Sequence, residues 1–210
     1  MKTAFFGGTF DPVHAGHLSL AREVLKQGRA DRILFVPAPS PPHKEIQRIT
    51  PFEHRLKMVQ LAIGNEPCFS WSDLERHRSG KSYTIDTLKE LSAGGEYGEI
   101  WLLIGSDSLR QLHLWYQCHE LVRDYGLIVY PRRGEPADRK ELEEHWSVSE
   151  TEKLLDAEMG EVPEFPVSST QIRDLIKKEG IKSVSAFVTS SVADYITEHH
   201  LYGKRGGIPW

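Results

Sequence analysis

The chain has 210 residues, of which 39% are hydrophobic and 27% charged, values typical of a globular protein with one buried core. Its formal net charge of -4 gives no basic surface for a nucleic-acid backbone and favours a free nucleotide as partner. No apolar run approaches the roughly 20 residues of a membrane-spanning helix. The distant Cys68 and Cys118 argue against a disulfide framework, and no signal-peptide pattern is present, so we expect a cytoplasmic location.

Strand and helix patterns alternate along the first 131 residues. Short apolar runs bounded by glycine, proline or polar residues predict strands at 3–8, 32–38, 68–72, 99–105 and 125–131. Between them, apolar residues at helical spacing predict helices at 18–28, 50–64 and 82–95. This alternation is typical of an α/β protein and predicts a doubly wound parallel sheet.

Local signals predict the ends of several helices. Thr50 is predicted to be the N-cap of the second helix, with Pro51 in the first turn and Glu53 completing a capping box. Gly28 is predicted to cap the first helix at its C-terminal end. Hydroxyl side chains at 168–170 predict the start of a later helix.

The last third of the chain follows a different pattern. Residues 132–164 are rich in charged side chains and poor in β-branched ones, which predicts solvated helices and a loop. We expect C-terminal helices within residues 169–200. Residues 1–210 are expected to form a single domain, with the charged segment as an excursion from it.

The stretch GGTFDPVHAGH, residues 7–17, directly follows the first predicted strand. In open α/β sheets, ligands bind outside the carboxyl ends of the strands, so a ligand is expected here. Gly7 and Gly8 allow the backbone to approach a ligand, and the following helix is expected to offer unpaired N–H groups to an anion. In a helical turn, His14 and His17 lie on one face beside that anion. The stretch is neither a P-loop nor a GxGxxG fingerprint.

Other interpretations of this stretch remain open from the residues alone. A lone histidine is most often structural or solvated, and a Gly-Gly pair can be a tight turn. A His-x-x-His pair can bind zinc, but it needs further ligands, and the two cysteines form no cluster. We therefore expect no metal on His14 and His17.

GGTFDPVHAGHL resembles the HxGH signature of the nucleotidyltransferase superfamily, and VSSTQIR (167–173) is similar to its second signature. PSPPHK (39–44), GKSYTIDTL (80–88) and IGSDSLRQLHLW (104–115) narrow the resemblance to the bacterial nicotinate-nucleotide adenylyltransferase family. The motifs occur in family order along nearly the whole chain. The resemblance implies a Rossmann-like nucleotidyltransferase fold and, in NAD biosynthesis, the transfer of AMP from ATP to nicotinate mononucleotide with release of pyrophosphate.

The resemblance also implies roles for individual residues. His14, His17 and Arg173 are expected to be catalytic, acting as donors to the phosphates without a general base, because a phosphate nucleophile is already ionised. The expected ATP contacts are Gly7, Gly8, Thr9, Phe10, His14, His17, Gly105, Asp107, Ser168, Ser169 and Arg173. The expected contacts to nicotinate mononucleotide are Gly8, Thr9, His43, Lys44, Thr84, Trp115 and Tyr116.

Several of these residues also have an ordinary structural explanation. Ser and Thr at 168–170 and Thr84 can simply cap helices, Trp115 can be a core residue, and Lys44 can be solvated surface. In the resembling family the Trp115 ring is expected to lie against the pyridine base, which is sensible because an indole face attracts a cationic ring.

Two alternative functions remain open. One is a sister enzyme acting on phosphopantetheine or nicotinamide mononucleotide, and the other is a nucleotide-binding sensor without turnover. The intact histidine pair together with SSTQIR favours an enzyme. Mg²⁺ is expected only as the partner of ATP, because it offsets polyphosphate charge. We expect neither a nucleic-acid nor a membrane partner, and the sequence leaves a homo-oligomer open.

Overall fold

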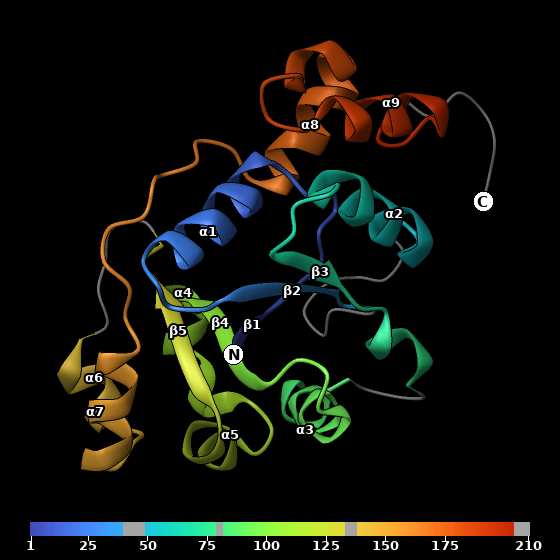
Figure 1. The fold of residues 1–210 in the computed structure, drawn as a ribbon. Helices are drawn as coiled ribbons and strands as arrows, with labels where there is room; N and C mark the ends of the chain where they lie inside the picture. The colour runs from blue at the N-terminus through green and yellow to red at the C-terminus, as the bar shows by residue number, and fades with distance from the viewer. Residues whose placement is uncertain (40–48, 79–81, 133–137, 204–210) are drawn as a thin grey trace.

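One parallel sheet lies at the centre of the molecule (Figure 1). The computed structural model describes residues 1–39, 49–78, 82–132 and 138–203, and within them five strands pair in the order β3-β2-β1-β4-β5. The strands are β1 (Lys2–Gly8), β2 (Arg32–Pro37), β3 (Phe69–Trp71), β4 (Glu99–Gly105) and β5 (Gly126–Tyr130). Each neighbouring pair is parallel, so the predicted doubly wound parallel sheet is confirmed.

Helices cover both faces of this sheet, as Figure 1 shows. Because successive strand residues point to opposite faces, Ala4 and Phe6 lie in one core cluster while Phe5 lies in the other. The helices of the first cluster include α1 (Ala15–Lys26) and α2 (Phe52–Ile63). Those of the second include α3 (Thr84–Gly94), α4 (Ser106–Arg110) and α5 (Cys118–Asp124). Both faces are buried, which explains why the strands are continuous apolar runs.

The strand order reverses at β1. The chain moves from β1 to β2 on one side through α1, and returns to β4 on the other side of β1. The carboxyl ends of β1 and β4, at Gly8 and Gly105, therefore lie next to the crevice where open α/β sheets bind ligands.

One of the two predicted helix ends in this half of the chain differs from the observed one. The prediction that Thr50 caps the second helix is wrong: α2 begins at Phe52, its N-cap is Pro51, and no side chain caps it. The Thr50 side chain is hydrogen-bonded to Tyr202 instead, while its backbone N–H donates to Asp11 Oδ2 at 3.3 Å and its carbonyl accepts from Arg55 Nε at 2.8 Å. The prediction for Gly28 is confirmed: it follows the C-cap of α1 with a left-handed φ of 65°, and its N–H donates to Leu25 O at 2.9 Å while Arg29 N donates to Val24 O at 3.0 Å.

The charged segment is less solvated than predicted. It forms α6 (Arg139–Glu143) and α7 (Val148–Asp156), which lie beside α5 in Figure 1. Their apolar side chains are buried in the second core cluster: Leu142, Trp146, Leu154 and Ala157. The chain then pairs with β5, where Val129 N donates to Ala157 O at 2.8 Å and Met159 N donates to Val129 O at 2.7 Å. The segment thus covers the β5 edge of the sheet, while its charges face solvent.

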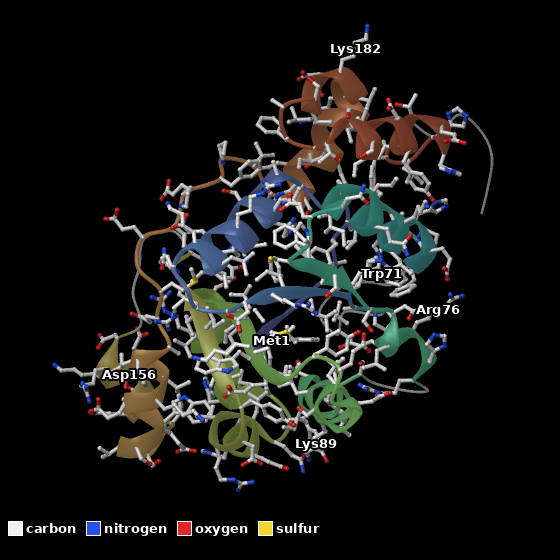
Figure 2. The ribbon with its side chains drawn as sticks, in the orientation of Figure 1. Met1, Trp71, Arg76, Lys89, Asp156 and Lys182 are labelled. Carbon is white, nitrogen blue, oxygen red and sulfur yellow. The ribbon has the colours of Figure 1, made fainter. Side chains whose placement is uncertain are left out.

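The C-terminal helices pack on the first face of the sheet. They are α8 (Ser169–Glu179), the short η4 (Ile181–Val184) and α9 (Ser190–Glu198). Their buried apolar residues belong to the same core cluster as Phe6 of β1. In Figure 2, Lys182 of η4 and Lys89 of α3 point outward from opposite ends of the molecule. None of the described helices is long and apolar enough to span a membrane.

Candidate active site

The two histidines of the opening stretch form the start of α1. His14 is the N-cap, and its Nδ1 accepts the backbone N–H of Gly16 at 3.1 Å. His17 lies one turn later, and its Nδ1 accepts the backbone N–H of His14 at 3.2 Å. The two rings contact one another, with centroids 3.8 Å apart. The prediction that both imidazoles lie on one face is confirmed.

This bonding determines the protonation of both rings. A neutral imidazole has one acceptor and one donor nitrogen, so an accepting Nδ1 leaves the proton on Nε2. Burial, followed by the positive charge of Arg132, lowers the pKa of His14 from 6.5 to about 4. Burial, then His14 and Arg132, lower the pKa of His17 well below 6.5. Near neutral pH the pair therefore offers two neutral Nε2–H donors.

The expectation of unpaired N–H groups at the start of α1 is wrong for its first three residues. Ala15 N donates to Phe187 O at 2.7 Å, Gly16 N to His14 Nδ1, and His17 N to His14 O at 2.9 Å. Capping by histidine uses the very donors that an anion would otherwise meet. What this helix start offers an anion is therefore imidazole N–H together with the positive end of the helix dipole.

Phe165, a residue without a predicted role, lies against this pair. Its ring stacks on that of His14, with centroids 5.3 Å apart and planes within 6°. Gly16 makes this possible, because a Cβ at that position would lie 2.6 Å from the Phe165 ring. The glycine between the two histidines is thus required by packing.

The residues that join β1 to α1 are held by the core. Phe10 has a left-handed φ of 48°, the residue is 2% exposed, and its ring centroid lies 5.1 Å from that of His17. Its side chain is therefore part of the core beneath the turn. A Cβ on Gly8 would lie 3.0 Å from the Phe10 ring, so this glycine also accommodates the turn. Thr9 is half-buried, and its carbonyl accepts from Arg55 at 2.8 Å.

The second signature meets the first across the start of α8. Ser168 is the N-cap of α8 and forms a capping box with Gln171, which confirms the predicted helix start. Ser169 Oγ donates to Pro12 O at 3.0 Å, and Arg173 Nη1 donates to Asp11 O at 2.6 Å. The side chain of Arg173 stays 24% exposed. Residues more than 150 positions apart in the sequence are thereby brought together.

The end of β4 contributes a further group of polar residues. Gly105 ends β4, and Asp107 lies in the first turn of α4. Asp107 Oδ2 pairs with Arg132 Nη1 at 2.8 Å, and Arg132 N donates to Ser106 Oγ at 2.9 Å. Arg132 was missed by sequence reasoning because it opens the charged segment that no motif covers. Its positive charge contributes to the lowered pKa of both histidines.

Three of the residues predicted to contact nicotinate mononucleotide, Thr84, Trp115 and Tyr116, lie on two adjoining segments. Thr84 is the first residue of α3, and no side chain caps that helix. Trp115 is half-buried against the second core cluster, while Tyr116 is 52% exposed. Tyr83 and Tyr116 bring the segments together, with ring centroids 4.4 Å apart.

His43 and Lys44 lie outside the described residues, but Arg55 holds the chain on both sides of them. The guanidinium is 1% exposed and donates to the carbonyls of Ala38 at 2.8 Å, Pro39 at 3.1 Å and Thr50 at 2.8 Å. Sequence reasoning placed Arg55 simply within a helix, because its partners are backbone carbonyls that leave no trace in the residue pattern.

Comparison with known proteins identifies the family. Residues 5–175 match the cytidylyltransferase-like family. A protein of Syntrophotalea carbinolica named probable nicotinate-nucleotide adenylyltransferase is 38% identical over 214 residues, covering 96% of this chain and 97% of the relative. One of the same name from a Synechococcus species is 39% identical over 201 residues, covering 96% of each. The chain belongs to the cytidylyltransferase-like family. Within it, full-length relatives carry the name that the sequence motifs predicted, so that resemblance is confirmed.

Solved structures share the fold. The Plasmodium falciparum nicotinic acid mononucleotide adenylyltransferase complexed with NaAD matches with a TM-score of 0.75 at 22% identity, covering 96% of this chain and 97% of that one. A putative nicotinate-nucleotide adenylyltransferase from Vibrio parahaemolyticus matches with a TM-score of 0.64 at 20% identity, covering 96% and 94%. The Rossmann-like nucleotidyltransferase fold expected from the sequence is confirmed.

Proposed function

We propose that this chain transfers AMP from ATP to nicotinate mononucleotide, forming nicotinate adenine dinucleotide and pyrophosphate. The observation that carries the proposal is the pair of neutral imidazoles at the strand-order reversal, each with Nδ1 bound to backbone and Nε2–H free to donate. The full-length relatives named nicotinate-nucleotide adenylyltransferase support the same reaction.

The chemistry needs no protein nucleophile. A phosphate oxygen of nicotinate mononucleotide attacks the α-phosphorus of ATP in line, the bond from that phosphorus to the bridging oxygen breaks, and pyrophosphate leaves. The attacking phosphate is ionised near neutral pH, so no residue has to remove a proton. Catalysis then consists of positioning and of stabilising charge on the transferring group, which neutral N–H donors do without being titrated.

Residues from three segments are proposed to hold ATP. His14 and His17 donate to the α- and β-phosphates, and Ser168, Ser169 and Arg173 bind the outer phosphates. Arg173 Nη1 donates to Asp11 O and Nη2 to Thr170 Oγ1, and the side chain remains 24% exposed, so the other N–H groups of its five-donor guanidinium are proposed to bind phosphate. The backbone of residues 7–10, together with Gly105 and Asp107, lines the nucleoside. We add Arg132 to this set, because it pairs with Asp107 at 2.8 Å and binds Ser106 through its backbone N–H at the end of β4.

The acceptor is proposed to bind between α3 and the segment before α5. The carboxylate of nicotinate accepts from the Thr84 hydroxyl and from the backbone N–H of Tyr116, and the Trp115 ring lies against the pyridinium. The contact between Tyr83 and Tyr116 supports this placement, because it brings the two proposed donors into neighbouring positions. Gly8 and Thr9 would lie near the phosphate, and His43 and Lys44 are assigned to it from the motif alone.

Mg²⁺ is proposed to enter with ATP. The side chains gathered at the site include the imidazoles of His14 and His17 and the guanidinium of Arg173, whose N–H groups bind phosphate oxygens. Magnesium prefers oxygen ligands and usually keeps several waters while it binds substrate phosphates, so this donor set fits a metal carried by the nucleotide. Bound Mg²⁺ neutralises polyphosphate charge.

We also propose that residues 1–210 act as one nucleotidyltransferase domain in the cytoplasm. One core cluster contains residues of β1, β2, α1, α2, α8 and α9, which supports a single folding unit. The exposed Cys68 and the buried Cys118 are both free thiols, as suits a reducing compartment.

The test is pyrophosphate release from Mg²⁺–ATP, measured with nicotinate mononucleotide, nicotinamide mononucleotide and phosphopantetheine as separate acceptors. We expect the highest kcat/KM with nicotinate mononucleotide, and the dinucleotide as a product of equal amount. A higher kcat/KM with either other acceptor would identify a sister enzyme. ATP binding without release for any acceptor would identify a nucleotide sensor.

A further inference from the structure

Asp11 of the opening stretch has a buried carboxylate with partners from three distant segments. The residue is 2% exposed. Its Oδ1 accepts the hydroxyl of Tyr202 at 2.6 Å, and its Oδ2 accepts the backbone N–H of Thr50 at 3.3 Å. Arg173 Nη1 lies 4.0 Å from Oδ2 while donating to the backbone carbonyl of the same residue. A buried carboxylate needs such partners, so the position of each one depends on the others.

Tyr202 comes from the chain beyond α9. It has a left-handed φ of 64°, and the preceding Leu201 is 5% exposed in the first core cluster. The Tyr202 hydroxyl also lies 3.9 Å from Met58 Sδ of α2 and is hydrogen-bonded to the side chain of Thr50. Burial and the neighbouring carboxylate raise the pKa of Tyr202 well above 10, which keeps the hydroxyl a donor at physiological pH.

The groups that face Asp11 leave Arg173 little freedom. Arg55, which lies on α2, attracts the Asp11 carboxylate electrostatically. Its N–H groups donate to the carbonyls of Thr9, Ala38 and Thr50. Arg173 approaches from α8, where its Nη2 donates to Thr170 Oγ1 at 3.2 Å, and its Nη1 donates to the backbone carbonyl of Asp11 at 2.6 Å. The position of Asp11, together with Thr170, therefore sets the direction of the Arg173 guanidinium.

We propose that Tyr202 is a positioning residue for adenylyl transfer, whose hydroxyl acts through Asp11 to hold Arg173 in the direction of the polyphosphate. This inference rests on the proposed function. Without the hydroxyl, Asp11 Oδ1 loses its only side-chain donor among the described residues, and the nearest side-chain cation is Arg173. The guanidinium then turns toward the carboxylate and away from ATP. Preorganised donors lose most of their benefit when they must be reoriented during the reaction.

The test is Tyr202→Phe, which removes one oxygen and keeps the ring. We expect KM for ATP to rise and kcat to fall, so that kcat/KM for ATP decreases by about 10-fold to 100-fold, the range expected for one hydrogen bond to a charged group. KM for nicotinate mononucleotide should stay within about twofold, because its proposed donors lie on other segments. General destabilisation would not separate the two substrates in this way.

The chain offers a matched control in Tyr195→Phe. The Tyr195 hydroxyl also bonds to one side chain, His54 Nδ1 at 2.9 Å, between α9 and α2 but away from the opening stretch. We expect wild-type kinetic constants for this variant. Equal losses in both variants, or wild-type constants in folded Tyr202→Phe, would overturn the proposal.

A double-mutant cycle with Arg173→Lys tests the route of the effect. If Tyr202 acts through Arg173, the losses in the double variant will be far less than additive; additive losses would contradict the proposal. Should Tyr202→Phe not fold, Asp11→Asn breaks the same network from the other end, because one carboxamide oxygen cannot serve both donors. In Asp11→Asn, KM for ATP should rise while KM for nicotinate mononucleotide stays nearly unchanged, as in Tyr202→Phe. A folded variant with wild-type constants would contradict the proposal.

Failure of the proposed function would be visible separately. If the unmutated chain releases no pyrophosphate with any acceptor, the transfer reaction is wrong. The placement of Arg173 can still be judged by titrating the unmutated chain and Tyr202→Phe with ATP in a calorimeter. Weaker ATP binding in the variant, with Tyr195→Phe unchanged, would support the positioning role, and equal binding in all three would refute it.

Discussion

His14 and His17 contact each other at the start of α1 with ring centroids 3.8 Å apart, and each binds a backbone N–H through Nδ1. Two protonated rings at this distance would repel one another, and burial already disfavours protonation of both. The pair is therefore built to remain neutral. Its donors are directed by the helix backbone, so the helix start and the phosphate site are one structure.

The first prediction concerns the contribution of His17. His17→Ala should lower kcat by about 10²–10³, the usual loss for one transition-state donor. Removal of its bond to His14 N should also lower the free energy of unfolding, by about 1 kcal/mol, as for loss of a helix cap. Steady-state kinetics and urea unfolding measure the two effects. His119→Ala, which removes an exposed histidine, serves as control, and an unchanged kcat in folded His17→Ala would exclude His17 from the chemistry.

The second prediction concerns stability against pH. His14 has a pKa of about 4 in the folded protein against 6.5 when unfolded, so the unfolded chain binds a proton first as pH falls. The stability conferred by the neutral ring is complete above pH 6.5 and is lost as pH decreases toward 4, with a total of about 3 kcal/mol. Urea unfolding at pH 5 and 7.5 should register about 2 kcal/mol of this loss, because pH 5 still lies above the folded pKa.

His14→Asn is the matched variant, because asparagine is itself a good N-cap. The free energy of unfolding of this variant should change less steeply with pH than that of the unmutated protein. The difference in slope should be up to about 1.4 kcal/mol per pH unit, the effect of one proton. An identical slope in both proteins would show that His14 titrates normally in the folded state.

The third prediction concerns the glycine between the histidines. Gly16→Ala would place a Cβ 2.6 Å from the Phe165 ring and displace that ring from His14. We expect a loss of about 1–3 kcal/mol in the free energy of unfolding, as for overpacking, together with a lower kcat. Gly94→Ala, in α3 with no atom within 4 Å of the new Cβ, should instead be neutral or stabilising. Equal stability of the two variants would contradict this role of Phe165.

The fourth prediction concerns the choice of acceptor. Nicotinate should be preferred to nicotinamide mononucleotide by about 10²–10⁴ in kcat/KM, because a carboxamide NH₂ facing donors is left unpaired. Thr84→Val should narrow this gap, whereas Trp115→Ala should weaken both acceptors alike, since the ring contacts a base common to both. Parallel kinetics with the two acceptors measure both effects. Comparable values in the unmutated protein would place the chain in the nicotinamide branch or make it dual-specific.

Local patterns in the sequence predicted the sheet and the start of the site well. The apolar strand runs and the Ser168 cap each depend on residues close together in the chain. The structure confirms these predictions. The Thr50 cap was wrong because Asp11 and Tyr202, which are remote from it in sequence, bind its backbone N–H and its side chain instead. A rule based on neighbouring residues cannot take account of hydrogen-bond partners that approach only when the chain is folded.

The residues that sequence reasoning missed share this cause. Phe165 meets His14 only after the whole charged segment has returned to the sheet, and Tyr202 meets Asp11 across 191 residues. Their types carry no signal, because a phenylalanine or a tyrosine near the end of a chain is most often ordinary packing. The charged segment was predicted as solvated because its many charges outweigh a few well-spaced apolar residues that close the β5 edge.

The bond between Tyr202 and Asp11 also orders events during synthesis of the chain. Every described strand lies within residues 2–130, so the sheet can pair before Arg173 and Tyr202 leave the ribosome. A nascent chain at that stage already contains both histidines, yet it lacks the groups that we assign to the outer phosphates and to their alignment. If the assigned roles are correct, turnover of ATP begins only when α8 and α9 dock. A protease that cut between the sheet and α8 would then remove the phosphate groups together with the apolar residues that complete the first core cluster.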